Sequence, residues 1–224
     1  MKKTAIVTAM REEAEHIIKL YGLINTNKLE NIIIYENENI VLALAGIGKI
    51  QASIATTYLF INYDISRLIN IGIAGSLLGD DANIGDVFIV NKISQHDMYL
   101  PFEGTHLDYA KKAIIVDSII DSIIDNNFDL FDFSVYYDSY CLTGDQFIDD
   151  SNKVKELREK YSANVIEMEA FAIASVAREF NQLNKCVFIK AISDGANNEA
   201  KDAHMGNLDF AMQNSIKVLN KIIN

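Results

Sequence analysis

Residues 186–195 read CVFIKAISDG, and their pattern indicates the fold class. Positions 186–192 are apolar except for Lys190, which is typical of a strand covered on both faces in a layered α/β protein. The strand is followed at once by Ser193, the carboxylate of Asp194 and a glycine. Ligands of open α/β sheets lie outside the carboxyl ends of the strands, so Asp194 is a candidate functional residue.

Similar apolar, β-branched runs alternate with amphipathic helical patterns along the rest of the chain. The predicted strands span residues 4–8, 32–35, 40–45, 67–73, 87–92, 135–142, 165–167 and 186–192. The predicted helices span residues 12–21, 50–62, 116–126, 152–161, 169–181 and 208–223. This alternation predicts βα units around a largely parallel sheet. Since the sequence contains no linker or repeat, we expect one domain over residues 1–224.

The composition of the 224 residues excludes several classes of protein. Half of the residues are hydrophobic and 23% are charged, which is typical of a globular chain. The 31 acidic residues against 20 basic ones disfavour nucleic acid as a partner, and no apolar run approaches the roughly 20 residues of a membrane span. The apolar run after Lys2 and Lys3 is too short for a signal peptide, so we expect a cytoplasmic protein. Cys141 and Cys186 lack zinc or redox spacing, which favours buried free thiols.

Acidic residues lie next to three of the predicted strands: Glu12 and Glu13, then Glu167 and Glu169, and finally Asp194. Each has a structural alternative, because acidic residues also favour helix starts and Asp-Gly is a common turn. Carboxyls held together in an apolar cleft have their pKa values pushed apart, so that one acts as an acid and another as a base. Such a set of carboxyls is suited to cleaving a glycosidic bond.

Two glycine pairs also follow predicted strands, in GIGK at 46–49 and GIAG at 72–75. Either the backbone approaches a ligand there or the chain makes a tight turn. Neither segment matches the dinucleotide fingerprint or the P-loop. His96, His106 and His204 lack metal-ligand spacing, so we expect structural or loop roles for them and no metal site.

Eight segments together resemble the 5'-methylthioadenosine/S-adenosylhomocysteine nucleosidases, a family within the purine nucleoside phosphorylase superfamily. They are AMREEAE (9–15), AGIGKI (45–50), NIGIAGSL (70–77), GDVFIV (85–90), QHD (95–97), TGDQFI (143–148), VIEMEAFAIA (165–174) and KAISDGA (190–196). VIEMEA and AISD are quite specific to the superfamily, whereas the glycine-rich pieces alone are weak signals. The resemblance implies a three-layer α/β/α sandwich with a mixed central sheet, and no cofactor.

The resemblance also implies roles for individual residues. Glu13 is similar to the carboxylate that activates the attacking water. Asp194, helped by Ser193, is similar to the acid that protonates N7 of adenine. Glu169 resembles the residue that binds the ribose hydroxyls, and Met168 resembles the residue that packs on the sugar.

Further implied roles concern the adenine and the 5' substituent. By resemblance, Phe147 would stack on the purine and the backbone of Ile148 would read its edge. Family members are homodimers whose partner loop covers the 5' substituent. The segment 94–112 shows no clear period, as is usual for a functional or interface loop, and with Tyr99 and Phe102 it is the candidate lid.

Three positions depart from the family pattern. Lys190 replaces an Arg, Ile73 replaces a Ser and Ala45 replaces a frequent Ser, and the first two fall at substrate-binding positions. A lysine cannot reproduce the bidentate hydrogen bonds of an arginine. A buried Lys190 also requires a carboxylate partner, for which Glu13 and Glu169 are candidates.

The leading hypothesis is therefore hydrolysis of an adenine nucleoside, 5'-methylthioadenosine or S-adenosylhomocysteine. A phosphorolytic relative is an alternative, although Glu12 and Glu13 would repel phosphate. A hydrolase for another purine nucleoside is a second alternative. A nucleoside-binding protein whose site has been eroded at Lys190 and Ile73 is a third.

Overall fold

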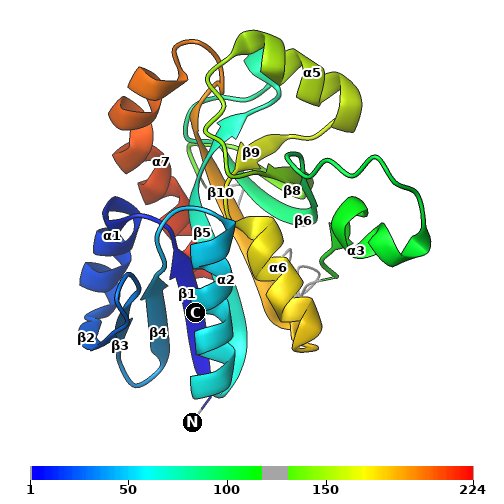
Figure 1. Ribbon diagram of the computed structural model, residues 1–224. Helices are drawn as coiled ribbons and strands as arrows, with labels where there is room; N and C mark the ends of the chain where they lie inside the picture. The colour runs from blue at the N-terminus through cyan, green and yellow to red at the C-terminus, as the bar shows by residue number, and fades with distance from the viewer. Residues whose placement is uncertain (1, 118–130, 224) are drawn as a thin grey trace.

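A mixed sheet runs through the computed structural model, which describes residues 2–117 and 131–223 (Figure 1). Its strands are β1 (Lys3–Thr8), β2 (Ile24–Lys28), β3 (Ile33–Glu36), β4 (Ile40–Leu44), β5 (Ile65–Ser76), β6 (Val87–Gln95), β7 (Ile114–Ile115), β8 (Val135–Thr143), β9 (Val165–Glu167) and β10 (Cys186–Asp194). The helices are α1 (Arg11–Tyr21), α2 (Lys49–Asn62), α3 (Asp108–Lys111), α5 (Ser151–Tyr161), α6 (Ala170–Glu179) and α7 (Ala200–Ile223).

The strands follow the order β10-β6-β8-β9-β5-β1-β4-β3-β2, and β7 pairs with β6. β1 lies parallel to both β4 and β5, and β5 lies parallel to β10. β10 also pairs with β6, so β5, β10, β6, β8 and β9 form a closed ring of paired strands. Five of the pairings in the described residues are antiparallel, so the sheet is mixed, and the expectation of a largely parallel sheet was wrong.

Helices cover the sheet on two sides, and each side has its own apolar core. The α2–α6 side buries Ala55 and Leu59 of α2 with Phe171 and Ile173 of α6. The α1–α7 side buries Ile17 and Leu219, among others. The result is the predicted three-layer α/β/α arrangement with a mixed central sheet (Figure 1).

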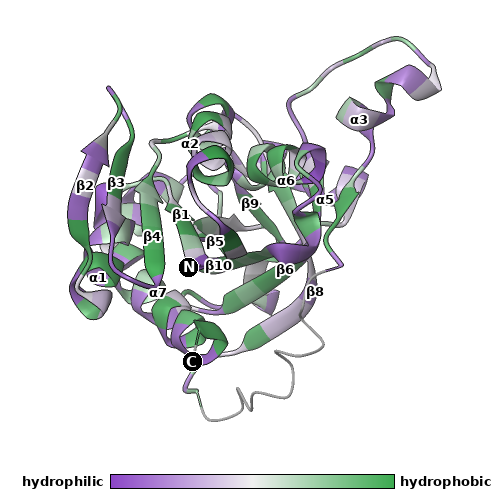
Figure 2. Cartoon of the chain, turned by 90° about the horizontal axis from the view of Figure 1, so that it is seen from below, coloured by the Kyte–Doolittle hydropathy of each residue, from purple (hydrophilic) through white to green (hydrophobic). Residues whose placement is uncertain are grey.

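The predicted elements differ from the observed ones mainly at their ends. The strand predicted at 67–73 extends over Ile65–Ser76, and the helix predicted at 208–223 begins eight residues earlier, at Ala200. β2 was not predicted, because INTNK is polar and lies at the edge of the sheet, where Figure 2 shows it largely purple. The segment 94–112 contains α3 and a short 3-10 turn.

Most of the helix predicted at 116–126 lies outside the described residues. None of the helices in the described part of the chain is long and apolar enough to cross a membrane.

Candidate active site

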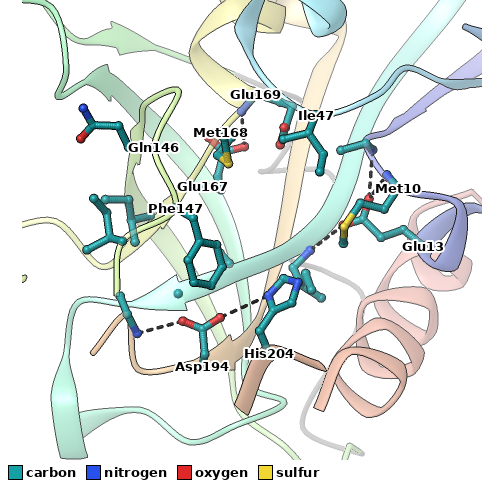
Figure 3. A pocket seen from close by; sticks show the side chains of 17 residues that line it. Met10, Glu13, Ile47, Gln146, Phe147, Glu167, Met168, Glu169, Asp194 and His204 are labelled. Atoms are coloured by element: carbon teal, nitrogen blue, oxygen red, sulfur yellow. Dashed lines mark hydrogen bonds and ion pairs between the residues drawn. The ribbon is translucent and has the colours of Figure 1, made fainter. Parts of the chain in front are cut away.

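One pocket gathers residues from distant parts of the chain beside the carboxyl ends of β1, β5 and β10 (Figure 3). The cavity has a volume of about 120 Å³ and is open to solvent at its mouth. Of the ten site residues predicted from the sequence, seven line this pocket, and Ser193, Lys190 and Phe102 do not. The lining residues are Ala9, Met10, Glu13, Ile47, Ile73, Ala74, Gly75, Gln146, Phe147, Ile148, Ile166, Glu167, Met168, Glu169, Asp194, Ala196 and His204.

Asp194 is the last residue of β10 and is almost completely buried. Its Oδ1 accepts a hydrogen bond from the Ala196 backbone N–H at 2.9 Å, and its Oδ2 accepts one from the Ser193 hydroxyl at 2.8 Å. Gly75 makes room for this carboxyl, because a Cβ there would lie 3.0 Å from Oδ1. Ser193 therefore lies behind the pocket wall and orients Asp194.

Glu13 is the third residue of α1 and is 3% exposed. Its carboxylate accepts hydrogen bonds from the backbone N–H groups of Ala9 (2.9 Å), Met10 (3.0 Å) and Ile73 (3.2 Å). Burial raises the pKa of Glu13, while these donors and the charge of a nearby lysine oppose the rise. The carboxylate both caps the helix start and lines the pocket, so the structural interpretation does not exclude the functional one.

The glycine at position 72 is required by Glu13 rather than by a ligand. A Cβ on Gly72 would lie 2.6 Å from Oε1 of Glu13, which is closer than real contacts allow. Since Gly75 makes room for Asp194 in the same way, the GIAG segment creates space for both carboxyls. Both glycines lie within β5, so this segment is not a tight turn, and its backbone approaches side chains of the pocket.

Glu169 precedes α6 and accepts a hydrogen bond from the Gly48 N–H at 2.8 Å. Burial and the neighbouring Glu167 carboxylate raise the pKa of Glu169 to about 8, against the opposing charge of Lys190. At neutral pH, Glu169 therefore carries a proton that it can donate to a ligand hydroxyl. Met168 lines the pocket beside it.

Lys190 forms a buried ion pair with Glu167, with 2.7 Å between Nζ and Oε2 and both side chains 2% exposed. The candidates from the sequence, Glu13 and Glu169, are thus not its direct partners. β10 and β9 both pair with β5, and this common neighbour brings Lys190 and Glu167 together. Burial alone would raise the pKa of Glu167, but the charge of Lys190 and a hydrogen bond from Thr143 lower it.

The remaining predicted residues lie on the apolar walls or outside the pocket. Phe147 is 45% exposed and points into the pocket (Figure 3), which Ile148 also lines. Ile73 presents its side chain to the pocket and its N–H to Glu13. Phe102 is 65% exposed on the 94–112 segment and contributes nothing to this pocket within one chain.

The sequence profile described as "Phosphorylase superfamily" matches residues 3–224. A 5'-methylthioadenosine/S-adenosylhomocysteine nucleosidase from Bacillus subtilis is 30% identical over 99% of this chain and 98% of its own length. The chain belongs to this nucleosidase family of the phosphorylase superfamily.

Two other similar proteins extend the comparison. The crystal structure of the nucleosidase of this family from Neisseria meningitidis, in complex with methylthio-immucillin-A, has a TM-score of 0.88. It is 27% identical, and the match covers 100% of this chain and 99% of that chain. A Helicobacter pylori protein named aminodeoxyfutalosine nucleosidase is 26% identical over 100% of this chain and 98% of its own length.

The resemblance to the nucleosidase family did not identify His204, which lines the pocket from α7. A structural or loop role was predicted for it, because its position shows no metal-ligand spacing. Its one signal was its place ten residues after Asp194, in the segment that follows β10. Lys49 and Asp97 of the family-like segments form an ion pair of 2.7 Å, and the Lys49 N–H donates to Asp145, so they tie loops of the site together.

Proposed function

We propose that this protein hydrolyses the N-glycosidic bond of 5'-methylthioadenosine and S-adenosylhomocysteine, releasing adenine and the 5-thio-substituted ribose. The observation that carries the proposal is that two buried carboxyls, Glu13 and Asp194, line the same pocket but come from different elements. A glycosidase needs an acid for the leaving group and a base for the attacking water. Membership of the nucleosidase family supports the same substrate class.

The proposed roles follow from the surroundings of each group. Asp194 protonates N7 of adenine, and the Ser193 hydroxyl orients it for this step. Glu13, with its raised pKa, accepts the proton of the attacking water. Protonated Glu169 donates to a ribose hydroxyl, and Phe147 stacks on the purine.

Hydrolysis is preferred to phosphorolysis because of the charges around the pocket. Glu13, Glu167, Glu169 and Asp194 all line it. Lys190, the cation closest to this cluster in the described residues, is buried and already paired with Glu167. Among the described residues, no lysine or arginine lines the pocket, so a phosphate ion would meet the negative charge of Glu13 without a cation to bind it.

The deciding experiment measures free adenine after incubation of the purified protein with 5'-methylthioadenosine or S-adenosylhomocysteine, with and without phosphate. We expect release at the same rate in both conditions. Release that requires phosphate would replace hydrolysis by phosphorolysis. Aminodeoxyfutalosine, the nucleoside named in the Helicobacter relative, is included as a third substrate. Adenine release from aminodeoxyfutalosine alone would make the protein a hydrolase for another purine nucleoside. Binding of the three nucleosides without adenine release from any of them would favour a nucleoside-binding protein.

We also propose that residues 1–224 form one domain and that the protein is a homodimer in the cytoplasm. Exposed apolar side chains on α2 and on the 94–112 segment support the dimer: Ile50, Ile54, Ile61, Tyr99 and Phe102. A partner's Phe102 would then cover the mouth of the pocket. Sedimentation equilibrium tests the dimer, and a monomer with full activity would exclude the partner loop from the site.

The buried free thiols of Cys141 and Cys186 suit a reducing compartment, which supports the proposed cytoplasmic location.

A further inference from the structure

The His204 side chain lies beside the Asp194 carboxyl at the pocket wall (Figure 3). Its Nδ1 is 3.5 Å from Oδ2 of Asp194 and 3.5 Å from Oγ of Ser193. Its ring meets the Phe147 ring edge-on, with 5.4 Å between the centroids. Asn207, one turn further along α7, donates to the Ser193 carbonyl at 3.0 Å and fixes the start of the helix at this place.

We propose that His204 is a positioning residue that returns a proton to Asp194 after each turnover. The proposal rests on the nucleosidase function proposed above and adds a residue and a step to it. The structure places two groups within reach of Nδ1, the Asp194 carboxyl and the Ser193 hydroxyl. Among the described residues, Asp194 is the one acidic side chain within ion-pair distance of His204.

The need for such a residue follows from the proton balance of hydrolysis. The bond between ribose C1' and adenine breaks, the adenine leaves with the proton of Asp194, and a new C1'–O bond forms with water. Glu13 takes the proton that water loses. The products together contain one added water, but the enzyme is left with ionised Asp194 and protonated Glu13. Before the next turnover Asp194 must gain a proton and Glu13 must lose one.

Burial makes this return difficult without a carrier. Asp194 is 2% exposed and Glu13 is 3% exposed, whereas the His204 side chain is 19% exposed. Histidine both accepts and donates protons near neutral pH. A doubly protonated His204 ring can give its Nδ1 proton to Oδ2 of Asp194 and then take another from solvent. The Ser193 hydroxyl, hydrogen-bonded to the same carboxyl oxygen, offers a second path for that proton.

The test compares the first turnover with continuous turnover in His204→Asn and His204→Phe. Asn retains a donor near the position of Nδ1 but does not ionise, and Phe retains the ring against Phe147. With enzyme in excess over 5'-methylthioadenosine, we expect both variants to release adenine at nearly the wild-type rate, since a single turnover is complete before a proton has to be returned to Asp194. In steady state we expect kcat to fall by about 10- to 100-fold with little change in KM. Added imidazole should restore the steady-state rate of His204→Ala.

The matched control is His16→Asn. His16 forms another histidine–aspartate pair, with Asp209 at 2.7 Å, and lies outside the pocket. This variant should match the wild type in both regimes. A wild-type kcat in His204→Asn would overturn the proposal, and so would a parallel fall of first-turnover and steady-state rates without rescue by imidazole. If the wild type itself releases no adenine, the proposed function fails and this inference fails with it, a result distinct from loss in the variants alone.

Discussion

Asp194 and Glu169 line the same pocket, yet the groups around them differ in kind. Asp194 is held by a hydroxyl and an N–H from its own strand end and the following turn. Glu169 belongs to a charged cluster with Glu167 and Lys190, which are brought together by pairing between distant strands. In the proposed binding mode, the adenine end of the pocket therefore depends on local hydrogen bonds, and the sugar end depends on long-range charge balance. Substitutions at the first should change the rate, whereas substitutions at the second should also change stability.

The largest effect is expected from Asp194→Asn at the adenine end. Asn keeps the shape of the side chain but has no acidic proton for the leaving base, so kcat should fall by about 1,000-fold or more. Binding of the nucleoside, measured by calorimetry, should be nearly unchanged. Asp202→Asn, on the exposed first turn of α7, is the control. Turnover close to that of the wild type would remove Asp194 as the acid.

A somewhat smaller loss is expected from Glu13→Gln, which tests whether Glu13 activates the attacking water at the sugar end. The amide cannot accept the proton of water, and kcat should fall by about 100- to 1,000-fold. Glu12→Gln is the matched control, because Glu12 is the neighbouring glutamate and is exposed. Equal rates for the two variants would show that Glu13 only caps α1.

The same contrast separates what could be predicted from the sequence from what could not. Asp194 and Glu13 were found because each follows an apolar strand and sits in a segment that resembles the nucleosidase family. The partner of Lys190 could not be predicted, because Glu167 reaches it only through the common neighbour β5. His204 was missed because the first two turns of α7 are polar and show no helical apolar period.

The alternation of strands and helices identified most of the elements, since buried strands and amphipathic helices have distinct periods. It did not give the direction of every strand. β6 lies antiparallel to β10 and β9 lies antiparallel to β5, and these pairings depend on contacts between distant residues. The polar edge strand β2 carried no apolar signal at all.

At the sugar end, Lys190→Met tests the charge balance through stability. It leaves Glu167 buried without its cation, which should lower the free energy of unfolding by about 3 kcal/mol. Urea unfolding of the variant and the wild type measures this loss. Lys217→Met is the control, because its pair with Asp132 is exposed and should contribute less than about 1 kcal/mol. The double variant Lys190→Met with Glu167→Met should recover part of the loss. Equal losses of stability in Lys190→Met and Lys217→Met would mean that the buried pair stabilises the protein no more than an exposed pair does.

The last effect is a pH slope that the proton on Glu169 should produce, small at any one step of pH. Its pKa is raised by burial and by Glu167 to about 8 from an ordinary 4.5, so between these pH values the folded chain retains a proton that the unfolded chain releases. Stability from this group is fully present below pH 4.5 and is lost as pH rises through 8, at up to about 1.4 kcal/mol per pH unit. The side chain of Glu169→Gln cannot titrate. The free energy of unfolding of this variant should therefore rise relative to that of the wild type between pH 4.5 and 8, and the difference should be constant above pH 8. Urea unfolding of both proteins at several pH values measures the difference. Curves that stay parallel from pH 4.5 to 8 would mean that Glu169 is ionised in the folded protein and must accept, rather than donate, the hydrogen bond of a ribose hydroxyl.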